Sequence, residues 1–480
     1  MQTGASNQIK NSTFWVYVGA LSVLLSIIIG LFIDNFILPL IPIGIIVVFL
    51  LSLDIKYGIY LLVGLFVFSF QATVPGTTLS FQIPTEPLIG LLVGLWILSI
   101  LTKSNVANSN RHSKKVKYTL AVFLGALFLS VLTSTMHLVS LKLFINTMFY
   151  VIAGVFVVER EVNSLEAIKK IIAIVFITLI FASIYTLIRH ASHGFSTLWA
   201  STVTEPFFPE HGSYAAALSI AFGIAFSLGI SSSTPSRIRI LSIISSLIFF
   251  VAIFFSYTRA AWLGLLTLFL FFAVFRFQNF FNKKIIVFLI IAVIAIGYIA
   301  TKYHVIQTAE KNARSITNVE ANYSNLERIN RWVAAIDMIR AKPIFGVGYG
   351  VYRFLYQKYR NPLFTTPISN MFAGPHNDYL QYFSEAGIFG ITTWLLFLFY
   401  LYKEALATYR IIQNEFIKNI LFGCLGGVLT YNVHAFFNGF LMFDKVAVPF
   451  WVCIGLILSI MGHQKIWSQN VQSISTPETT

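Results

Sequence analysis

Residues 171–188 read IIAIVFITLIFASIYTLI, an apolar stretch without a single charged side chain. A helix needs about 20 such residues to cross roughly 30 Å of hydrocarbon. The apolar residues are continuous rather than alternating, which indicates a helix and not a barrel strand. Similar stretches recur along the chain, and they predict an all-α, polytopic integral membrane protein with about 12–14 transmembrane helices.

The candidate spans begin near residues 14, 35, 58, 87, 118, 139, 168, 213, 238, 260, 284, 386, 417 and 446. The first is not followed by a small-residue cleavage site, so we expect a retained helix and no signal peptide. The predicted organisation is a set of N-terminal membrane helices over residues 1–301, a polar loop over 302–385, C-terminal spans over 386–464 and a tail over 465–480.

The composition excludes a soluble protein, because 57% of the 480 residues are hydrophobic and only 11% are charged. The net charge of +15 is not gathered into a dense basic tract, so we expect no nucleic-acid partner. Both cysteines, Cys424 and Cys453, lie inside apolar runs and offer neither a disulfide framework nor zinc-ligand spacing. Histidines and carboxylates are scattered, and we expect no metal and no cofactor.

The distribution of Lys and Arg orients the chain. With the N-terminus inside, 19 of the 33 fall in predicted cytoplasmic segments, and ten of the others lie in the 302–385 loop. Long loops do not determine orientation, so the pattern agrees with the positive-inside rule. We expect a multi-pass membrane protein with both termini in the cytoplasm and the long loop on the outer side.

The long loop is patterned. Leu326, Ile329, Val333, Ile336 and Ile339 recur at helical spacing, which predicts an amphipathic helix that packs on the membrane domain or lies at the outer interface. Its charged residues are expected on the other faces, and it ends before Pro343. Gly346, Gly348 and Gly350 then predict a tight turn, because they lack the Lys-Ser/Thr ending of a phosphate-binding P-loop.

Three arginines are candidates for anion binding. Arg259 lies between two apolar runs, where a guanidinium either snorkels to the interface or binds an anion such as phosphate. Arg328 and Arg331 lie on the amphipathic helix, where they either form a solvated face or contribute to the same anion site.

His376 and Asn377 stand where the polar loop gives way to an apolar run. A neutral histidine there can accept a proton from an attacking hydroxyl, or it can simply cap and hydrogen-bond the turn. Asn377 can orient the turn or cap it, and Asp378 can act as the N-cap of the following helix.

These residues resemble the O-antigen ligase and polymerase family of bacterial envelope glycosyltransferases. The family motif is a His and a polar amide or hydroxyl residue, nine residues, a Gly, two residues and a small or aromatic residue. His376, Asn377, Gly387 and Gly390 match it in full. Ser256 to Gly264 resembles the family's serine-to-arginine segment. Further similarity lies in Arg328 with Trp332, Pro343, Gly346, Gly348 and Gly350.

The resemblance implies transfer of a glycan from an undecaprenyl-diphosphate carrier to an acceptor hydroxyl, without metal and without nucleotide. It places the protein in the bacterial inner membrane, with the long loop and the active site facing the periplasm. It assigns His376 as the catalytic base and Arg259 and Arg328 as ligands of the donor diphosphate. Arg331 and Arg189 are further candidates for that contact. The acceptor is lipid A-core for a ligase, a second carrier-linked repeat for a polymerase, and a Ser or Thr for a protein O-oligosaccharyltransferase. A ligase is favoured by the long loop before the motif.

A polysaccharide or lipid transporter is the alternative from another class. Transporters are expected to show related halves and charged or broken helices near the midplane. Here the charge is concentrated at the outer face, which favours an enzyme.

Overall fold

The computed structural model describes residues 54–73, 80–102, 111–276, 323–361 and 373–464, with positions 44, 47–49, 51, 366, 369, 370 and 467. The chain divides into two compact units, Met1–Leu61 and Leu62–Thr480, and the arrangement described below is that of the second. The predicted spans near residues 14, 35 and 284, the loop residues 302–322 and most of the tail lie outside the described residues.

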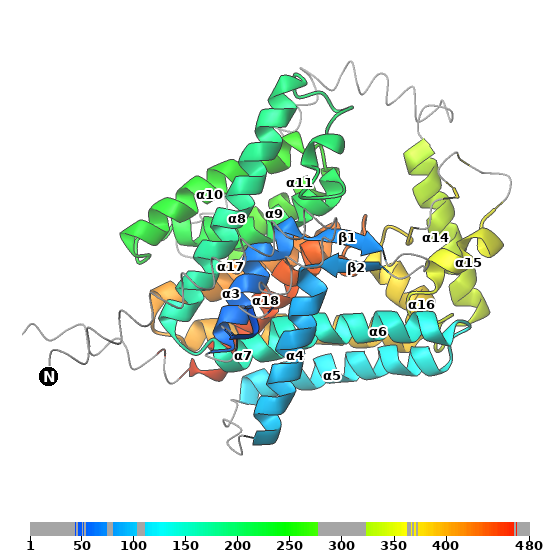
Figure 1. Ribbon diagram of the computed structural model, residues 1–480, viewed down its shortest axis with the longest axis horizontal. Helices are drawn as coiled ribbons and strands as arrows, with labels where there is room; N and C mark the ends of the chain where they lie inside the picture. The colour runs from blue at the N-terminus through cyan, green and yellow to red at the C-terminus, as the bar shows by residue number, and fades with distance from the viewer. Residues whose placement is uncertain are drawn as a thin grey trace, which may run out of the picture. The chain divides into compact units, whose positions relative to one another are not determined.

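Every predicted span that begins within the described residues coincides with a helix. The bounds are α3 Lys56–Leu65, η1 Phe66–Phe68, α4 Thr85–Thr102, α5 Arg111–Leu132, α6 His137–Val151, η2 Ile152–Val157, α7 Val158–Glu161, α8 Leu165–Ser192, η3 Thr202–Thr204, α9 His211–Gly229, α10 Ser236–Phe255, α11 Arg259–Arg276, α14 Tyr323–Ala341, α15 Tyr352–Tyr359, α16 Asp378–Ile411, α17 Glu415–His434 and α18 Asp444–Gly462 (Figure 1).

Among the described residues, eight helices are long and apolar enough to cross a membrane, and three shorter apolar helices accompany them. The all-α class is therefore confirmed, and the chain is a multi-pass membrane protein. One small hairpin was not predicted: β1 (Phe70–Thr73) and β2 (Ser80–Ile83) pair antiparallel, with Phe70 opposite Ile83.

Glycines bring the central helices together. α9, α17 and α18 are almost entirely buried, and α9 packs along α17. A Cβ added to Gly223 of α9 would lie 2.5 Å from the backbone nitrogen of Gly427, and one on Gly423 would lie 2.8 Å from Cα of Ile224. Small residues four apart let two helix backbones approach this closely, as is typical of packing inside membranes.

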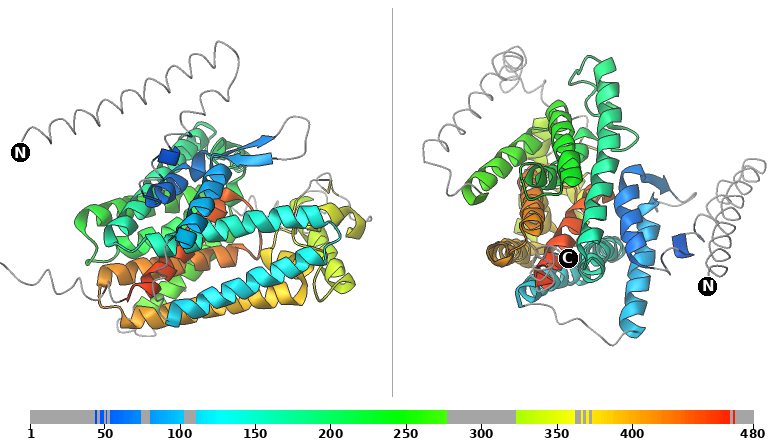
Figure 2. Two further views of the ribbon diagram at one scale, coloured as in Figure 1. Left: turned by 60° about the horizontal axis from the view of Figure 1, so that its bottom comes forward. Right: turned by 90° about the vertical axis from the view of Figure 1, so that its left-hand side faces the viewer.

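A second group of helices positions the site. α5 packs along α16, with α6 beside α5 (Figure 1). α14 and α15, which follow the 277–322 gap, lie at one end of this group, drawn in yellow-green in Figure 2. α16 begins at Asp378, earlier than the span predicted near residue 386, and its backbone breaks at Gly387.

Candidate functional site

The break in α16 is a joint that receives the glycine turn after α14. Gly387 has φ 67° and ψ −163°, a conformation essentially restricted to glycine. A Cβ there would lie 2.1 Å from the carbonyl oxygen of Ile344, and a Cβ on Gly346 would lie 2.3 Å from the carbonyl oxygen of Glu385. The two glycines therefore allow the turn and the helix to meet backbone to backbone.

Hydrogen bonds fasten this joint. The Val347 N–H donates to the Ser384 carbonyl and the Gly348 N–H to the Glu385 carbonyl, each at 3.0 Å. The Ile388 N–H donates back to the turn, at the Pro343 carbonyl, over 2.9 Å. Gly346, Gly348 and Gly350 all have positive φ, which confirms the predicted tight turn. Because these amides serve the joint, they do not form a phosphate cradle.

The predicted amphipathic helix is α14, and part of its apolar stripe faces outward. Ile329, Val333 and Ile336 are 55%, 41% and 41% exposed, whereas Glu327 and Arg331 are only 2% and 1% exposed. Of the two predicted places for the stripe, these exposures favour the outer interface. Glu327 and Arg331 point inward because they hold the segment that leads to His376.

Glu327 and Arg331 form a buried ion pair one helical turn apart, with Arg331 Nε 2.9 Å from Glu327 Oε1. The Tyr356 hydroxyl donates to the same oxygen at 2.9 Å, while Thr366 and Ser369 donate to Oε2 at 2.7 and 2.6 Å. Burial raises the pKa of Glu327, but these hydrogen bonds and Arg331 outweigh it, and the net pKa falls below the usual range. The carboxylate is thus charged and fully engaged.

Arg331 also reaches the chain just before the histidine. Its Nη1 donates to the carbonyl of Ala373 at 2.6 Å, and its guanidinium lies 4.4 Å from the centre of the Tyr356 ring. Its own carbonyl accepts from the Tyr352 hydroxyl at 2.7 Å. These contacts favour a positioning role for Arg331 in place of the diphosphate contact expected from the sequence.

Asn377, and not Asp378, is the N-cap of α16. The Leu380 N–H donates to Asn377 Oδ1 at 2.9 Å, and Asn377 Nδ2 donates to the carbonyl of Phe436 at 3.0 Å. Asp378 is the first helical residue, and its carboxylate accepts from the Tyr431 hydroxyl at 2.6 Å. An amide caps a helix as well as a carboxylate does, and its NH2 group can donate a further hydrogen bond. Asn377 therefore also connects the turn to the end of α17 through the carbonyl of Phe436.

His376 is held between these anchors in a strained backbone conformation, with φ 53°. Positive φ is uncommon outside glycine and concentrates at functional sites. Burial, Arg331 and Arg328 together lower the pKa of His376 to about 4, against a smaller opposing effect of Glu327. The half-buried imidazole is therefore neutral at pH 7.

Arg328, half-buried on α14, lies near Arg259 at the start of α11. Burial and Arg259 lower the pKa of Arg328, and Glu210 opposes them. Arg259 is exposed and makes no hydrogen bond or ion pair with another described residue. Two cations held close together form a site for an anion, because a bound anion relieves their repulsion. Glu210 is a weak counter-ion, since burial raises its pKa although Arg328 opposes this.

Arg189 has other contacts. It donates to the carbonyl of Glu205 and lies 5.5 Å from the centre of the Tyr185 ring, so it holds the segment after α8. Trp332 is half-buried, and its indole N–H has no hydrogen-bond partner among the described residues. Gly390 follows the helix break, and a Cβ on it would lie 2.4 Å from that of Ala386. Both glycines of the His376 motif are therefore explained by the break.

Two histidines complete the surroundings of Arg328. His211 and His434 both interact electrostatically with it. His434 is fully buried, and neither ring nitrogen has a hydrogen-bond partner among the described residues. Across all the residues that the structure describes, no group of three or more His, Cys, Asp or Glu side chains is arranged to hold a metal ion.

Residues 244–395 match the family model described as O-antigen ligase. This segment belongs to the O-antigen ligase family. Among curated proteins, none matches the chain. The ligase segment runs from within α10 to within α16 and contains Arg259, Arg328, Arg331 and His376. The last three interact at one end of the α5–α16 pair, and Arg259 interacts electrostatically with Arg328. Glycosyltransferase activity of the ligase type, with a glycan donor and an acceptor in a membrane, follows from the family.

Sequence reasoning did not identify Glu327 or His434 as parts of this site. Glu327 precedes Arg331 by four residues, a spacing that pairs opposite charges on a helix and would have revealed the ion pair. His434 carries no local signal, because it reaches the site only through the packing of α17.

Proposed function

We propose that the protein transfers a glycan from a polyprenyl-diphosphate carrier to an acceptor hydroxyl at the periplasmic face of the inner membrane. The observation that carries the proposal is a neutral His376 that interacts electrostatically with Arg328, which in turn interacts with Arg259. The acceptor is proposed to be lipid A-core, as in an O-antigen ligase.

Arg259 and Arg328 supply what the leaving group requires. A diphosphate leaves as an anion, and preorganised cations stabilise the charge that develops on it. Guanidinium groups suit phosphate because they donate two parallel hydrogen bonds and remain charged. The exposed Arg259 contacts the diphosphate from α11, while the half-buried Arg328 contacts it from α14.

His376 acts as the base. The acceptor oxygen attacks the anomeric carbon, its proton passes to the imidazole, and the bond to the carrier diphosphate breaks. A pKa of about 4 leaves the free imidazole deprotonated, although so weak a base is inefficient near neutral pH. A bound diphosphate compensates the positive charge of Arg328 and raises the pKa of His376, so the base gains strength only when the donor is present.

Arg331 and Asn377 position the base. Arg331 fixes the backbone before His376, and Asn377 fixes the backbone after it. Both contacts go to main-chain atoms, so they set the imidazole's place without touching the reacting groups. This division separates the diphosphate contacts of Arg259 in α11 and Arg328 in α14 from the positioning contacts of Arg331 in α14 and Asn377 at the start of α16.

The test is glycan transfer by purified protein from one defined carrier-linked donor, offered lipid A-core, a second carrier-linked repeat and a Ser/Thr peptide in parallel. Transfer to lipid A-core alone is expected. Transfer only to the second donor indicates a polymerase, and transfer only to the peptide indicates a protein O-oligosaccharyltransferase. No transfer to any of them, with the donor intact and the protein folded, refutes the proposal.

Deletion in cells gives an independent readout. Loss of all polymer from lipid A-core is expected if the protein is the ligase. A single repeat remaining on the core is the result for a polymerase, and an unchanged lipopolysaccharide contradicts both.

A further inference from the structure

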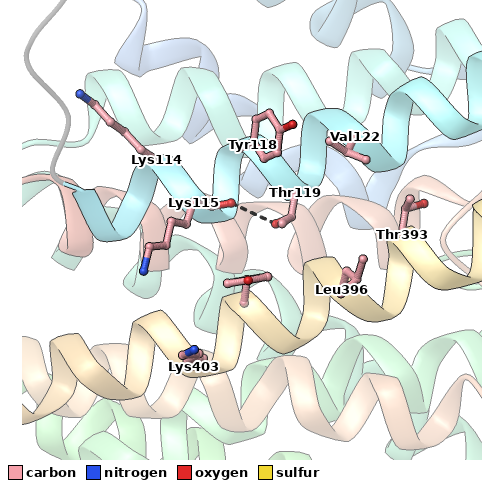
Figure 3. A pocket seen from close by; sticks show the side chains of 9 residues that line it. Lys114, Lys115, Tyr118, Thr119, Val122, Thr393, Leu396 and Lys403 are labelled. Carbon is pink, nitrogen blue, oxygen red and sulfur yellow. Dashed lines mark hydrogen bonds between the residues drawn. The ribbon is translucent and has the colours of Figure 1, made fainter.

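A groove between α5 and α16 lies apart from the site described above. Its volume is about 710 Å³. It is lined by Lys114, Lys115, Tyr118, Thr119, Val122, Thr393, Leu396, Tyr400 and Lys403 (Figure 3). The three lysines gather at one end, and Val122, Thr393 and Leu396 line the other. The groove is therefore amphipathic along its length.

The groove opens at the opposite end of α16 from His376. Lys403 lies about 25 residues after Asp378, or roughly 37 Å of helix at 1.5 Å per residue. That length exceeds the roughly 30 Å of a bilayer core, so the two sites face opposite leaflets. The positive-inside pattern predicts the cytoplasmic leaflet for the lysines.

The charge of the groove is not balanced by the protein. Lys115 Nζ lies 2.8 Å from Glu404 Oε1, and His112 also binds this buried carboxylate, so Lys115 is neutralised. Lys114 and Lys403 are exposed and have no acidic partner among the described residues. Lys403 lies over the ring of Tyr400 at 5.7 Å. Two ammonium groups without a carboxylate partner among the described residues thus mark the polar end.

The surface around the groove is apolar. Tyr118, Leu396 and Phe399 are 72%, 44% and 57% exposed. In a membrane protein such side chains contact lipid, and the apolar wall of the groove continues this surface. A free phosphate or a soluble nucleotide would use the lysines but leave the apolar wall uncovered.

We infer that this groove binds an anionic phospholipid of the inner leaflet. Its phosphate lies at the end of the groove that carries Lys114 and Lys403, and an acyl chain lies along Val122 and Leu396. Basic pockets between transmembrane helices on the cytoplasmic side are suited to anionic head groups. Because α5 and α16 form the groove and α16 also carries the joint at Gly387, the lipid clamps the helix pair that supports the site.

The test is lipid binding to the purified full chain, measured by native mass spectrometry with phosphatidylglycerol and phosphatidylcholine as probes. The wild-type chain is expected to bind phosphatidylglycerol in preference to phosphatidylcholine. Lys114→Gln and Lys403→Gln should each weaken the binding of phosphatidylglycerol about fivefold. Lys170→Gln is the matched control, since Lys170 is an exposed lysine of α8 paired with Glu166. It should leave binding unchanged.

Salt provides a second readout that needs no variant. Raising the ionic strength should weaken the binding of phosphatidylglycerol to the wild-type chain and leave that of phosphatidylcholine unchanged. Equal binding of the two lipids, equal loss in all three lysine variants, or displacement of the lipid by millimolar inorganic phosphate would each overturn the proposal.

Discussion

Gly387→Ala is predicted to undock the glycine turn from α16. Alanine at φ 67° and ψ −163° carries a backbone penalty of about 1–3 kcal/mol. Its Cβ would also lie 2.1 Å from the carbonyl oxygen of Ile344, which is a backbone atom and cannot rotate away. The turn must therefore move.

The cost follows from the bonds that the movement breaks. Three backbone hydrogen bonds fasten the joint, between Val347 and Ser384, Gly348 and Glu385, and Ile388 and Pro343. Each contributes about 1 kcal/mol, so undocking costs about 3 kcal/mol beyond the backbone penalty. A total of about 4–6 kcal/mol is a large part of the 5–15 kcal/mol that stabilises a typical protein.

The assay is thermal unfolding in detergent, combined with limited tryptic cleavage after Arg340 and Arg353, which lie on either side of the glycine turn. Gly387→Ala should lower the unfolding temperature and speed both cleavages. Gly125→Ala is the control, because Gly125 lies in α5 with no atom within 4 Å of the added Cβ. It should be neutral or slightly stabilising. A loss below about 1 kcal/mol for Gly387→Ala would refute the role given to the joint.

Three further predictions concern the charges around His376. Arg331→Met should cost about 3–5 kcal/mol of stability in thermal unfolding by leaving Glu327 unpaired, and adding Glu327→Gln should recover part of it; strictly additive losses would contradict the ion pair. His376 has a pKa of about 4 in the folded protein and about 6.5 unfolded, so the wild type should lose about 3 kcal/mol as pH falls from about 6.5 to 4. His376→Asn should lack this acid sensitivity. If the unfolding temperature of this variant depended on pH as that of the wild type does, the lowered pKa of His376 would be contradicted. Arg328→Gln removes a positive charge that lowers the pKa of His376, so this pKa should rise and the acid limb of kcat/KM for glycan transfer should move to higher pH. An acid limb at the wild-type pH would contradict the interaction between Arg328 and the base.

The membrane fold was predictable from the sequence because every helix that crosses the hydrocarbon core needs about 20 continuous apolar residues. Each predicted span within the described residues became a helix. The hairpin of β1 and β2 was not predicted, because two four-residue strands carry little pattern. The glycine turn was predictable, since positive φ selects glycine, but its docking partner was not. Only the fold shows that Gly346 and Gly387 meet.

The site could be predicted in part. His376 and Arg259 were proposed from their positions at predicted span ends and Arg328 from its place on the amphipathic helix, together with the family pattern. In the fold Arg328 interacts electrostatically with both of the others. The amphipathic helix α14 was predicted, but the sequence left the place of its apolar stripe open and did not reveal that the helix buries the ion pair of Glu327 and Arg331. Asn377 and Asp378 were both candidate caps, since both residue types cap equally well, and the fold selects Asn377.

The central claim is that His376 is the base for a donor held by Arg259 and Arg328. The most direct test is single-turnover transfer with saturating carrier-linked donor, which isolates the chemical step. His376→Ala should slow this step by roughly 10²- to 10⁴-fold with the fold intact, while Arg259→Gln should also weaken donor binding. Full single-turnover rates in His376→Ala, with unfolding temperature and donor affinity unchanged, would contradict the account.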